Sequence, residues 1–168
     1  MTEKILPIWK LKDPVQTPVL RAVAEPIAID AITTPEMSKL VRLMVKAMYA
    51  ANGIGLAAPQ IGRSIRLAVI SPEVQNLPAP LVLFNPTITS PSTQQETMEE
   101  GCLSLPKVFG PVARAWALTV TALDQQGQPY TLRAEGLLAR VIQHEVDHLN
   151  GKLFIDRADK ITHGKNLL

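Results

Sequence analysis

Near its C-terminal end the chain reads Gln143-His144-Glu145-Val146-Asp147-His148. Residues four positions apart lie on one face of an α-helix, so the imidazoles of His144 and His148 can both reach one metal ion. Glu145 lies one step around the helix, where its carboxylate can accept a proton from metal-bound water. The alternative interpretation is an ordinary helix with scattered surface histidines. The residue types and their spacing favour a metallohydrolase site.

The residues around this motif predict a helix over roughly residues 136 to 150. Two adjoining stripes recur at helical spacing, Leu137-Val141-His144-His148 and Leu138-Ile142-Glu145-Leu149. Gly151 follows them and suits a left-handed C-terminal cap. The stripes indicate that the two histidines continue a surface that faces the core.

Two histidines do not fill a zinc or iron site, so another residue must supply a third ligand. The segment after His148 contains no Glu, and Phe154 stands where a related peptidase pattern has a third histidine. The remaining candidates are an upstream residue or one of Asp156, Asp159 and His163.

Cys102 is the only cysteine of the chain and lies in the run Glu99-Glu100-Gly101-Cys102-Leu103-Ser104-Leu105-Pro106. A lone cysteine is most often a small buried hydrophobic residue. A thiolate, however, binds zinc or ferrous iron well, and Gly101 lets the backbone come close. Cys102, His144 and His148 together would leave a fourth coordination position for water, which distinguishes a catalytic site from a closed structural one.

A third segment is rich in small residues and reads Gly53-Ile54-Gly55-Leu56-Ala57-Ala58-Pro59-Gln60-Ile61-Gly62. It lacks the lysine of a phosphate-binding loop and the third glycine of the dinucleotide motif. Small residues leave the backbone accessible to an extended peptide, which could pair with it as an added strand. Gln60 could then donate a hydrogen bond to an oxyanion. The alternative is a helix-ending turn that leads into a buried strand.

Together and in this order, the three segments resemble the peptide deformylase family. That family is marked by a Gly-hydrophobic-Gly-hydrophobic-Ala-Ala-x-Gln run, by Glu-Gly-Cys-hydrophobic-Ser and by His-Glu-x-Asp-His. These motifs correspond here to Gly53–Gln60, Glu100–Ser104 and His144–His148. The resemblance covers most of residues 13 to 157. It implies a metal-dependent hydrolase that removes the N-formyl group from the formylmethionine of newly synthesised chains and releases formate.

The resemblance also implies a ligand set and a proton-transfer residue. Cys102, His144 and His148 would bind one divalent metal ion per chain. Glu145 would be the general acid/base for attack of metal-bound hydroxide on the formyl carbon. A Cys/His/His set suits zinc, iron, cobalt and nickel alike. The resemblance favours Fe2+, with Zn2+, Ni2+ and Co2+ as alternatives.

Further roles follow from the resemblance for the oxyanion and the substrate. Gln60 and the backbone N–H of Leu103 would form the oxyanion hole. The substrate-binding residues would be Ile54 and Gly55, which pair with the peptide backbone, and Gly101, Leu137 and Val141, which border the methionine pocket. Core packing is the alternative role for this last group.

The composition fits one soluble domain over residues 1–168, because 168 residues of which 46% are hydrophobic can form one sizeable core. The N-terminus lacks the apolar run of a signal peptide, and no stretch approaches the ~20 apolar residues of a membrane span. We therefore expect a cytoplasmic protein with no membrane contact, or an organellar matrix or stromal form whose transit peptide has been removed.

The net charge and its distribution indicate which classes of partner the protein can bind. A net charge of +2, with no arginine cluster among aromatic residues, predicts no specific nucleic-acid binding. The expected partners are N-formylmethionyl nascent peptides. The basic pI of about 8.8 could assist a transient contact with the ribosome, although a mixed, solvated surface explains it equally well.

The expected fold is a single α+β domain, with antiparallel or mixed β-sheets packed around a central metal-binding helix. Thr34 as N-cap and Pro35 at the first helical position predict a helix from about residue 35 to 51. Strands are expected at 66–70, 81–84, 96–100, 117–123 and 130–134.

Two charged groups could support the site. Glu100 and Arg114 would form an ion pair that steadies the Cys102 segment, and Asp147 would anchor the metal helix in the same way. The alternative is that these residues are solvated surface charges.

Two rival functions remain. One is a metal-dependent peptidase or amidase of other specificity, for which a downstream third ligand is missing. The other is a metal-binding module, which explains neither an open coordination position nor Glu145.

Overall fold

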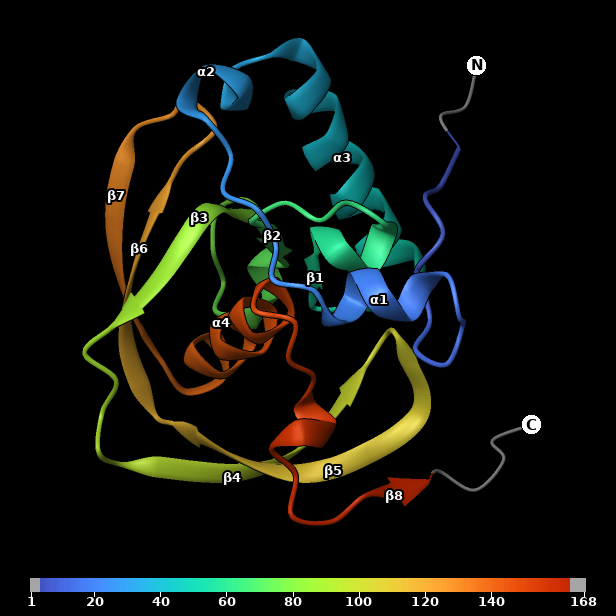
Figure 1. Ribbon diagram of the computed structural model, residues 1–168. Helices are drawn as coiled ribbons and strands as arrows, with labels where there is room; N and C mark the ends of the chain where they lie inside the picture. Colours follow the sequence, from blue (N-terminus) through green and yellow to red (C-terminus); the bar gives the residue numbers. More distant parts are fainter. Residues whose placement is uncertain (1–3, 164–168) are drawn as a thin grey trace.

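Helix α4 (Gly136–Leu149) lies at the centre of the molecule, between two antiparallel β-sheets (Figure 1). The structure, a computed structural model, describes residues 4–163, the side chain of His163 apart. The other helices are α1 (Gln16–Arg21), α2 (Ile29–Ile32) and α3 (Pro35–Ala50), with short 3₁₀ helices at η1 (Ala58–Ile61), η2 (Pro72–Val74) and η3 (Phe154–Asp156). The α+β class with antiparallel sheets around a central helix is therefore confirmed.

Helix α4 forms where the apolar stripes predict it and ends one residue earlier. Gly151 adopts a left-handed conformation with φ of 69°, as expected for the cap. A methyl group there would also lie 2.3 Å from the carbonyl oxygen of Arg21, so the end of the helix approaches α1 closely. The stripe that begins at Leu137 does not face the core at its N-terminal end, because Leu137 is 42% exposed.

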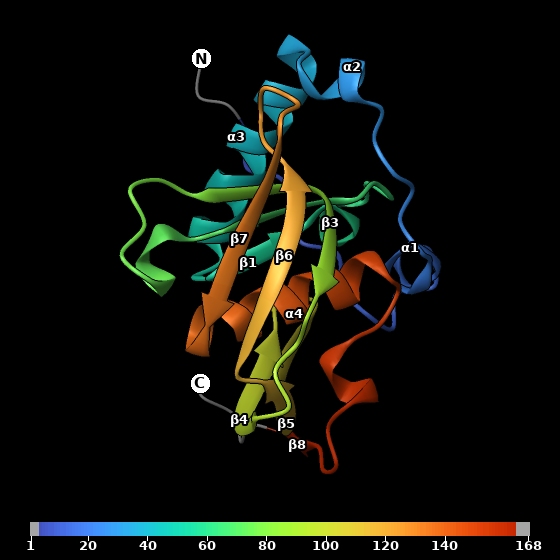
Figure 2. The ribbon, with the colours of Figure 1, turned by 90° about the vertical axis from the view of Figure 1, so that its left-hand side faces the viewer.

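The larger sheet has the strand order β1-β2-β3-β6-β7. Its strands are β1 (Gly55–Ala57), β2 (Leu67–Ile70), β3 (Leu81–Thr89), β6 (Ala117–Leu123) and β7 (Pro129–Glu135). Figure 2 shows α4 running behind β3, β6 and β7. Since β1 is the last strand in this order, one of its edges has no partner strand among the described residues.

Strand β2 is buried on both faces because helices cover both sides of this part of the sheet. Ala68 and Ile70 pack in the core around α4, whereas Leu67 and Val69 pack in the core with α3. Successive side chains of a strand point to opposite faces, so four consecutive apolar residues fill two cores. Strand β1 pairs with β2, which holds it next to α4.

The smaller sheet has the order β4-β5-β8, with β4 (Gln95–Cys102), β5 (Leu105–Ala115) and β8 (Thr162–His163). Strand β5 was not predicted, because Gly110 and Pro111 interrupt its pattern. Proline is tolerated there because β8 pairs only with Val108 and Phe109, so Pro111 lies beyond the reach of β8. The pairing with β4 is regular up to Gly101 and then shifts register, and Cys102 stands at the end of β4.

The remaining predicted elements are present with small changes in length. The hydroxyl of Thr34 accepts a hydrogen bond from the N–H of Met37 at 3.2 Å, and Pro35 opens α3. The strand expected at 81–84 extends to Thr89, and the one expected at 96–100 extends to Cys102. None of the helices formed by residues 4–163 has the length and apolar character that a membrane span requires.

Candidate active site

A thiol and two imidazoles meet where the end of β4 approaches α4. The Sγ atom of Cys102 lies 3.2 Å from Nε2 of His148. One ligand atom from each of Cys102, His144 and His148 lies within 4.8 Å of the other two. The helical spacing of the two histidines therefore brings both rings to the same thiol, as the sequence predicts.

The other candidate ligands are placed differently. Asp156 accepts a hydrogen bond from the side chain of Arg21 and another from the N–H of Leu153. Among the described side chains, neither Asp156 nor Asp159 belongs to a cluster with the two histidines of α4. The side chain of His163 lies outside the described part of the structure.

Glu100 holds His144 in place from the side away from the thiol. Its buried carboxylate lies 3.0 Å from Nδ1 of His144 and accepts two hydrogen bonds of 2.8 Å from Arg114 and one of 2.7 Å from Arg140. Burial favours the neutral carboxyl, but the hydrogen bonds from Arg114 and His144 outweigh it and hold the pKa of Glu100 well below its usual value. The predicted ion pair between Glu100 and Arg114 is present.

Arg114 also links this network to the last turn of α4. It donates a hydrogen bond of 2.6 Å to Asp147, which pairs in addition with Arg157. Burial again favours the neutral acid, and the hydrogen bonds from Arg157 and Arg114 lower the pKa of Asp147. The predicted anchoring of the helix through Asp147 is therefore present, and it runs through the same arginine that holds Glu100.

The electrostatics of the cluster suit a divalent cation. Burial opposes ionisation of the Cys102 thiol, but the neighbouring His148 and His144 lower the pKa of Cys102 well below its usual value. Burial likewise opposes a charged His144, yet hydrogen bonds to Cys102 and Glu100 raise its pKa to about 10. The negative charge that favours a proton here also favours a metal ion, which displaces such protons when it binds. The three residues therefore fit a metal of the zinc or ferrous type.

Glu145 is packed against the backbone of β1. A methyl group at Gly55 would lie 2.3 Å from Oε1 of Glu145, so only glycine leaves room for the carboxylate. Its second oxygen, Oε2, is buried and has no hydrogen-bond partner in the described protein. Burial raises the pKa of Glu145, although His144 and His148 oppose this effect. A carboxylate of raised pKa suits a group that accepts and returns a proton near neutral pH.

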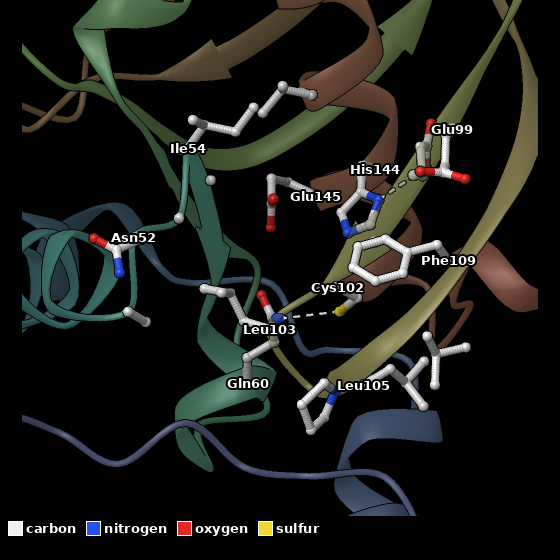
Figure 3. A pocket seen from close by; sticks show the side chains of 18 of the residues that line it. Asn52, Ile54, Gln60, Glu99, Cys102, Leu103, Leu105, Phe109, His144 and Glu145 are labelled. Atoms are coloured by element: carbon white, nitrogen blue, oxygen red, sulfur yellow. Dashed lines mark hydrogen bonds and ion pairs between the residues drawn. The ribbon is translucent and has the colours of Figure 1, made fainter. Parts of the chain in front are cut away.

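The side-chain amide of Gln60 lies against the thiol of Cys102 (Figure 3). Its Oε1 accepts a hydrogen bond of 2.9 Å from the N–H of Ala57. Its Nε2 lies 3.5 Å from Sγ of Cys102 and 3.2 Å from Oγ of Ser104. These contacts fix the orientation of the amide, with its N–H groups toward the turn that carries Leu103.

A cleft of about 530 Å³ opens onto this group of residues. Its rim carries large hydrophobic side chains that are between 38% and 44% exposed, namely Ile54, Met98, Phe109 and Leu137. Gly55, Gly101, Val141 and Glu145 also line the cleft. Figure 3 shows Ile54 across the cleft from Cys102. An apolar cleft with few polar groups at one end is typical of a ligand site.

Residues 5–163 match the family of polypeptide deformylases. The chain belongs to that family. As a polypeptide deformylase, it carries the three family motifs on β1 and η1, on the end of β4, and on α4. The fold thus brings together three segments that lie forty residues apart in the sequence.

Relatives and solved structures agree with this assignment. The peptide deformylase of Synechococcus sp. (strain CC9605) is 50% identical over 123 residues, which cover 73% of this chain and 61% of that protein. The crystal structure of the Thermotoga maritima peptide deformylase has a TM-score of 0.85 at 37% identity and covers 94% of this chain and 100% of that one. A Met-Ala-Ser-bound deformylase from Acinetobacter baumannii has a TM-score of 0.84 at 34% identity, with 93% and 99% covered. The chain matches about three-fifths of the length of the first curated relatives.

In this deformylase, the residues predicted to bind the metal, transfer the proton, hold the oxyanion or bind the substrate all line the cleft except His148, which is buried. Sequence reasoning missed Arg140 and Lys10, which also line the cleft. Arg140 lies one turn before His144, so its position on the helix is a signal that could have indicated it. Nothing in the sequence around Lys10 could have indicated it, because its side chain contacts Leu103, more than ninety positions away.

Proposed function

We propose that this polypeptide deformylase removes the formyl group from N-formylmethionyl peptides by metal-dependent hydrolysis. The observation that carries the proposal is the thiol and two imidazoles beside the buried, unpartnered carboxylate of Glu145, at one end of an apolar cleft. Cys102, His144 and His148 are the proposed ligands. Residues 1–168 would act as one catalytic domain.

The proton transfers are assigned to Glu145. When bound, the divalent ion supplies a Lewis acid that makes water nucleophilic near neutral pH. The carboxylate of Glu145 accepts the proton of that water as its oxygen attacks the formyl carbon. Glu145 then donates the proton to the amine nitrogen as the C–N bond breaks. The products are formate and a peptide with a free N-terminal methionine.

Two donors are assigned to the oxyanion that forms on the formyl group. The side-chain amide of Gln60 and the backbone N–H of Leu103 would donate hydrogen bonds to it. Their orientation is supported by the contacts of Gln60 with Ala57 and Ser104. Loss of one such donor typically lowers the rate by about 100- to 1000-fold.

The cleft supplies the contacts for the peptide. Its backbone would pair with the free edge of β1 at Ile54 and Gly55, as an added antiparallel or parallel strand. The methionine side chain would lie among Gly101, Leu137 and Val141. The Acinetobacter baumannii protein binds the peptide Met-Ala-Ser, which supports a peptide that begins with methionine as the ligand of this cleft.

The native metal and the place of action are further parts of the proposal. We infer Fe2+, because a thiolate with two imidazoles accepts ferrous iron as well as zinc, nickel or cobalt and the family resemblance favours iron. The substrates would be formylated nascent chains, met in the bacterial cytoplasm or in an organellar matrix or stroma. Contact with the ribosome would be transient and weak, since the net charge is only +2.

The test compares formate release from formyl-Met-Ala-Ser by the wild-type protein and by Glu145→Gln, both purified without oxygen. The amide keeps the shape of the side chain but cannot accept the proton, so we expect turnover to fall by about 100- to 10,000-fold. Metal content, measured in both proteins, serves as the control and should be equal, with iron in the wild type. Zinc alone in that preparation would contradict iron.

The rival functions predict other outcomes. A metal-loaded wild type that is inactive on every formyl-peptide would identify a binding module. Cleavage of internal peptide bonds would identify a peptidase of other specificity.

A further inference from the structure

An extended segment near the N-terminus, residues 9–11, bridges the two places that carry the proposed oxyanion donors. The N–H of Trp9 donates a hydrogen bond of 2.7 Å to the carbonyl oxygen of Gln60. The N–H of Leu11 donates one of 2.9 Å to the carbonyl oxygen of Ser104, next to Leu103. We call residues 9–11 the strap. It ties η1 to the turn between β4 and β5, although these segments lie more than forty residues apart.

Lys10, the middle residue of the strap, reaches into the cleft. Its Nζ donates a hydrogen bond of 2.5 Å to the carbonyl oxygen of Leu103, and the residue lines the cleft. Its backbone N–H donates one of 2.6 Å to Oε1 of Gln16, which holds the strap from the other side. Partial burial lowers the pKa of Lys10, while the thiolate charge of Cys102 opposes that effect. The ammonium group is thus partly desolvated, which strengthens its bond to the carbonyl.

The peptide group between Leu103 and Ser104 is held at both ends. Its carbonyl oxygen accepts from Lys10, and its N–H, on Ser104, lies 3.4 Å from Sγ of Cys102. The proposed donor, the N–H of Leu103, belongs to the preceding peptide group. Only the two backbone rotations of Leu103 separate these groups, so fixing one restricts the direction of the other.

We propose that Lys10 is a positioning residue, which together with the strap sets the Leu103 peptide relative to the Gln60 amide so that both donors converge on one point. This inference rests on the proposed function. A misplacement of about 1 Å in such a site can lower the rate about 100-fold. Because the donors act on charge that develops only in the transition state, a loosened strap lowers kcat rather than raising KM.

The experiment measures kcat and KM for formyl-Met-Ala-Ser, metal content and the Kd of the product Met-Ala-Ser in wild type and Lys10→Met. Methionine keeps an unbranched side chain up to the ε position and removes the hydrogen-bond donor. We expect kcat to fall about tenfold, with KM, product Kd and metal content within about twofold. The matched control is Lys12→Met, because Lys12 is exposed and its side chain has no hydrogen bond or ion pair within residues 4–163. Its parameters should equal those of the wild type.

Two more variants separate positioning from a general structural role. Lys10→Arg restores a cationic donor and should recover most of the lost kcat. In a Gln60→Ala background, Lys10→Met should cost much less than in the wild type, because the second donor has already gone.

Each contrary outcome is distinct. Equal and additive losses in the two backgrounds, or a Lys10→Met protein with unchanged kcat, would overturn the positioning role. A raised KM and a raised product Kd with unchanged kcat would identify Lys10 as a substrate contact instead. A wild type that is inactive while it holds metal would refute the proposed function itself.

Discussion

At Gly55 the backbone of β1 comes close to the carboxylate of Glu145, the proposed proton-transfer group. A methyl group there would meet Oε1 of Glu145 at 2.3 Å and the side chain of Val141 at 3.0 Å. We expect Gly55→Ala to push the Glu145 carboxylate from its place and to lower deformylase turnover by about 100-fold, the cost of a displacement near 1 Å. Formate release under saturating substrate measures the effect.

Gly53→Ala is the matched control for that prediction. A methyl group at Gly53 would meet the flexible tip of Leu103 at 2.7 Å and only ordinary contacts otherwise. The control should therefore lose much less activity than Gly55→Ala. Equal losses in the two variants would mean that contact with Leu103, whose N–H is a proposed oxyanion donor, costs as much as contact with Glu145, and the loss in Gly55→Ala could then not be assigned to Glu145.

The site residues differ in how far the sequence could predict them. His144 and His148 follow from helical spacing alone, since one turn of helix fixes their separation. Cys102 is one of several candidates for the third ligand, and it is preferred because a thiolate binds zinc or ferrous iron well and because its segment resembles the family motif. Arg140 could have been suspected from its position one turn before His144, although its hydrogen bond to Glu100 could not. Lys10 could not be predicted, because its hydrogen bond to Leu103 depends on how distant segments pack.

At the scale of elements, a substitution at the start of α3 should change the stability of the protein without changing its activity. The hydroxyl of Thr34 caps the N-terminus of α3. The cleft is lined at the other end of this helix, by Ala51 and Asn52. We expect Thr34→Ala to lower the free energy of unfolding by about 1 kcal/mol and to leave kcat/KM unchanged. Urea denaturation measures the first quantity.

Thr33→Ala is the control for the cap, because Thr33 precedes it and donates only to the carbonyl oxygen of Asp30. It should change the stability less than Thr34→Ala does. A fall in kcat/KM for Thr34→Ala would show instead that α3 transmits strain to the cleft.

The elements that could be predicted are those whose pattern is decided locally. Strand β2 and helices α3 and α4 have uninterrupted apolar patterns and clear ends. Strand β5 contains Gly110 and Pro111, and it forms because β4 offers a partner to every residue from Phe109 to Ala115. The presence of a partner strand depends on the tertiary fold, so the local sequence pattern of β5 could not predict it.

At the scale of the molecule, the proposed metal joins the smaller sheet to α4. A ligand that binds only the folded state raises its stability, by about 2.7 kcal/mol when its free concentration is a hundred times its Kd. For a chain of this size that corresponds to roughly 5 to 10 °C in Tm. We expect zinc added to chelator-treated protein to raise Tm by this amount, and calorimetry would measure it.

Variants of the ligands decide whether the cluster is responsible. The rise in Tm on adding zinc should vanish in His148→Ala and in the nearly isosteric Cys102→Ser. It should persist in His163→Ala, which removes the third histidine of the chain. A rise that survives in His148→Ala, or is lost in His163→Ala, would place the metal elsewhere.

The central position of α4 has a consequence for folding during synthesis. Chains are synthesised from the N-terminus, so the strands of the larger sheet leave the ribosome before the helix that fills the centre. Until Leu149 has been made, the inner apolar face of Ile70, Leu83 and Val120 lacks its cover. The core around α4 cannot be completed, and Cys102 cannot meet the two histidines, until this last long helix has been synthesised.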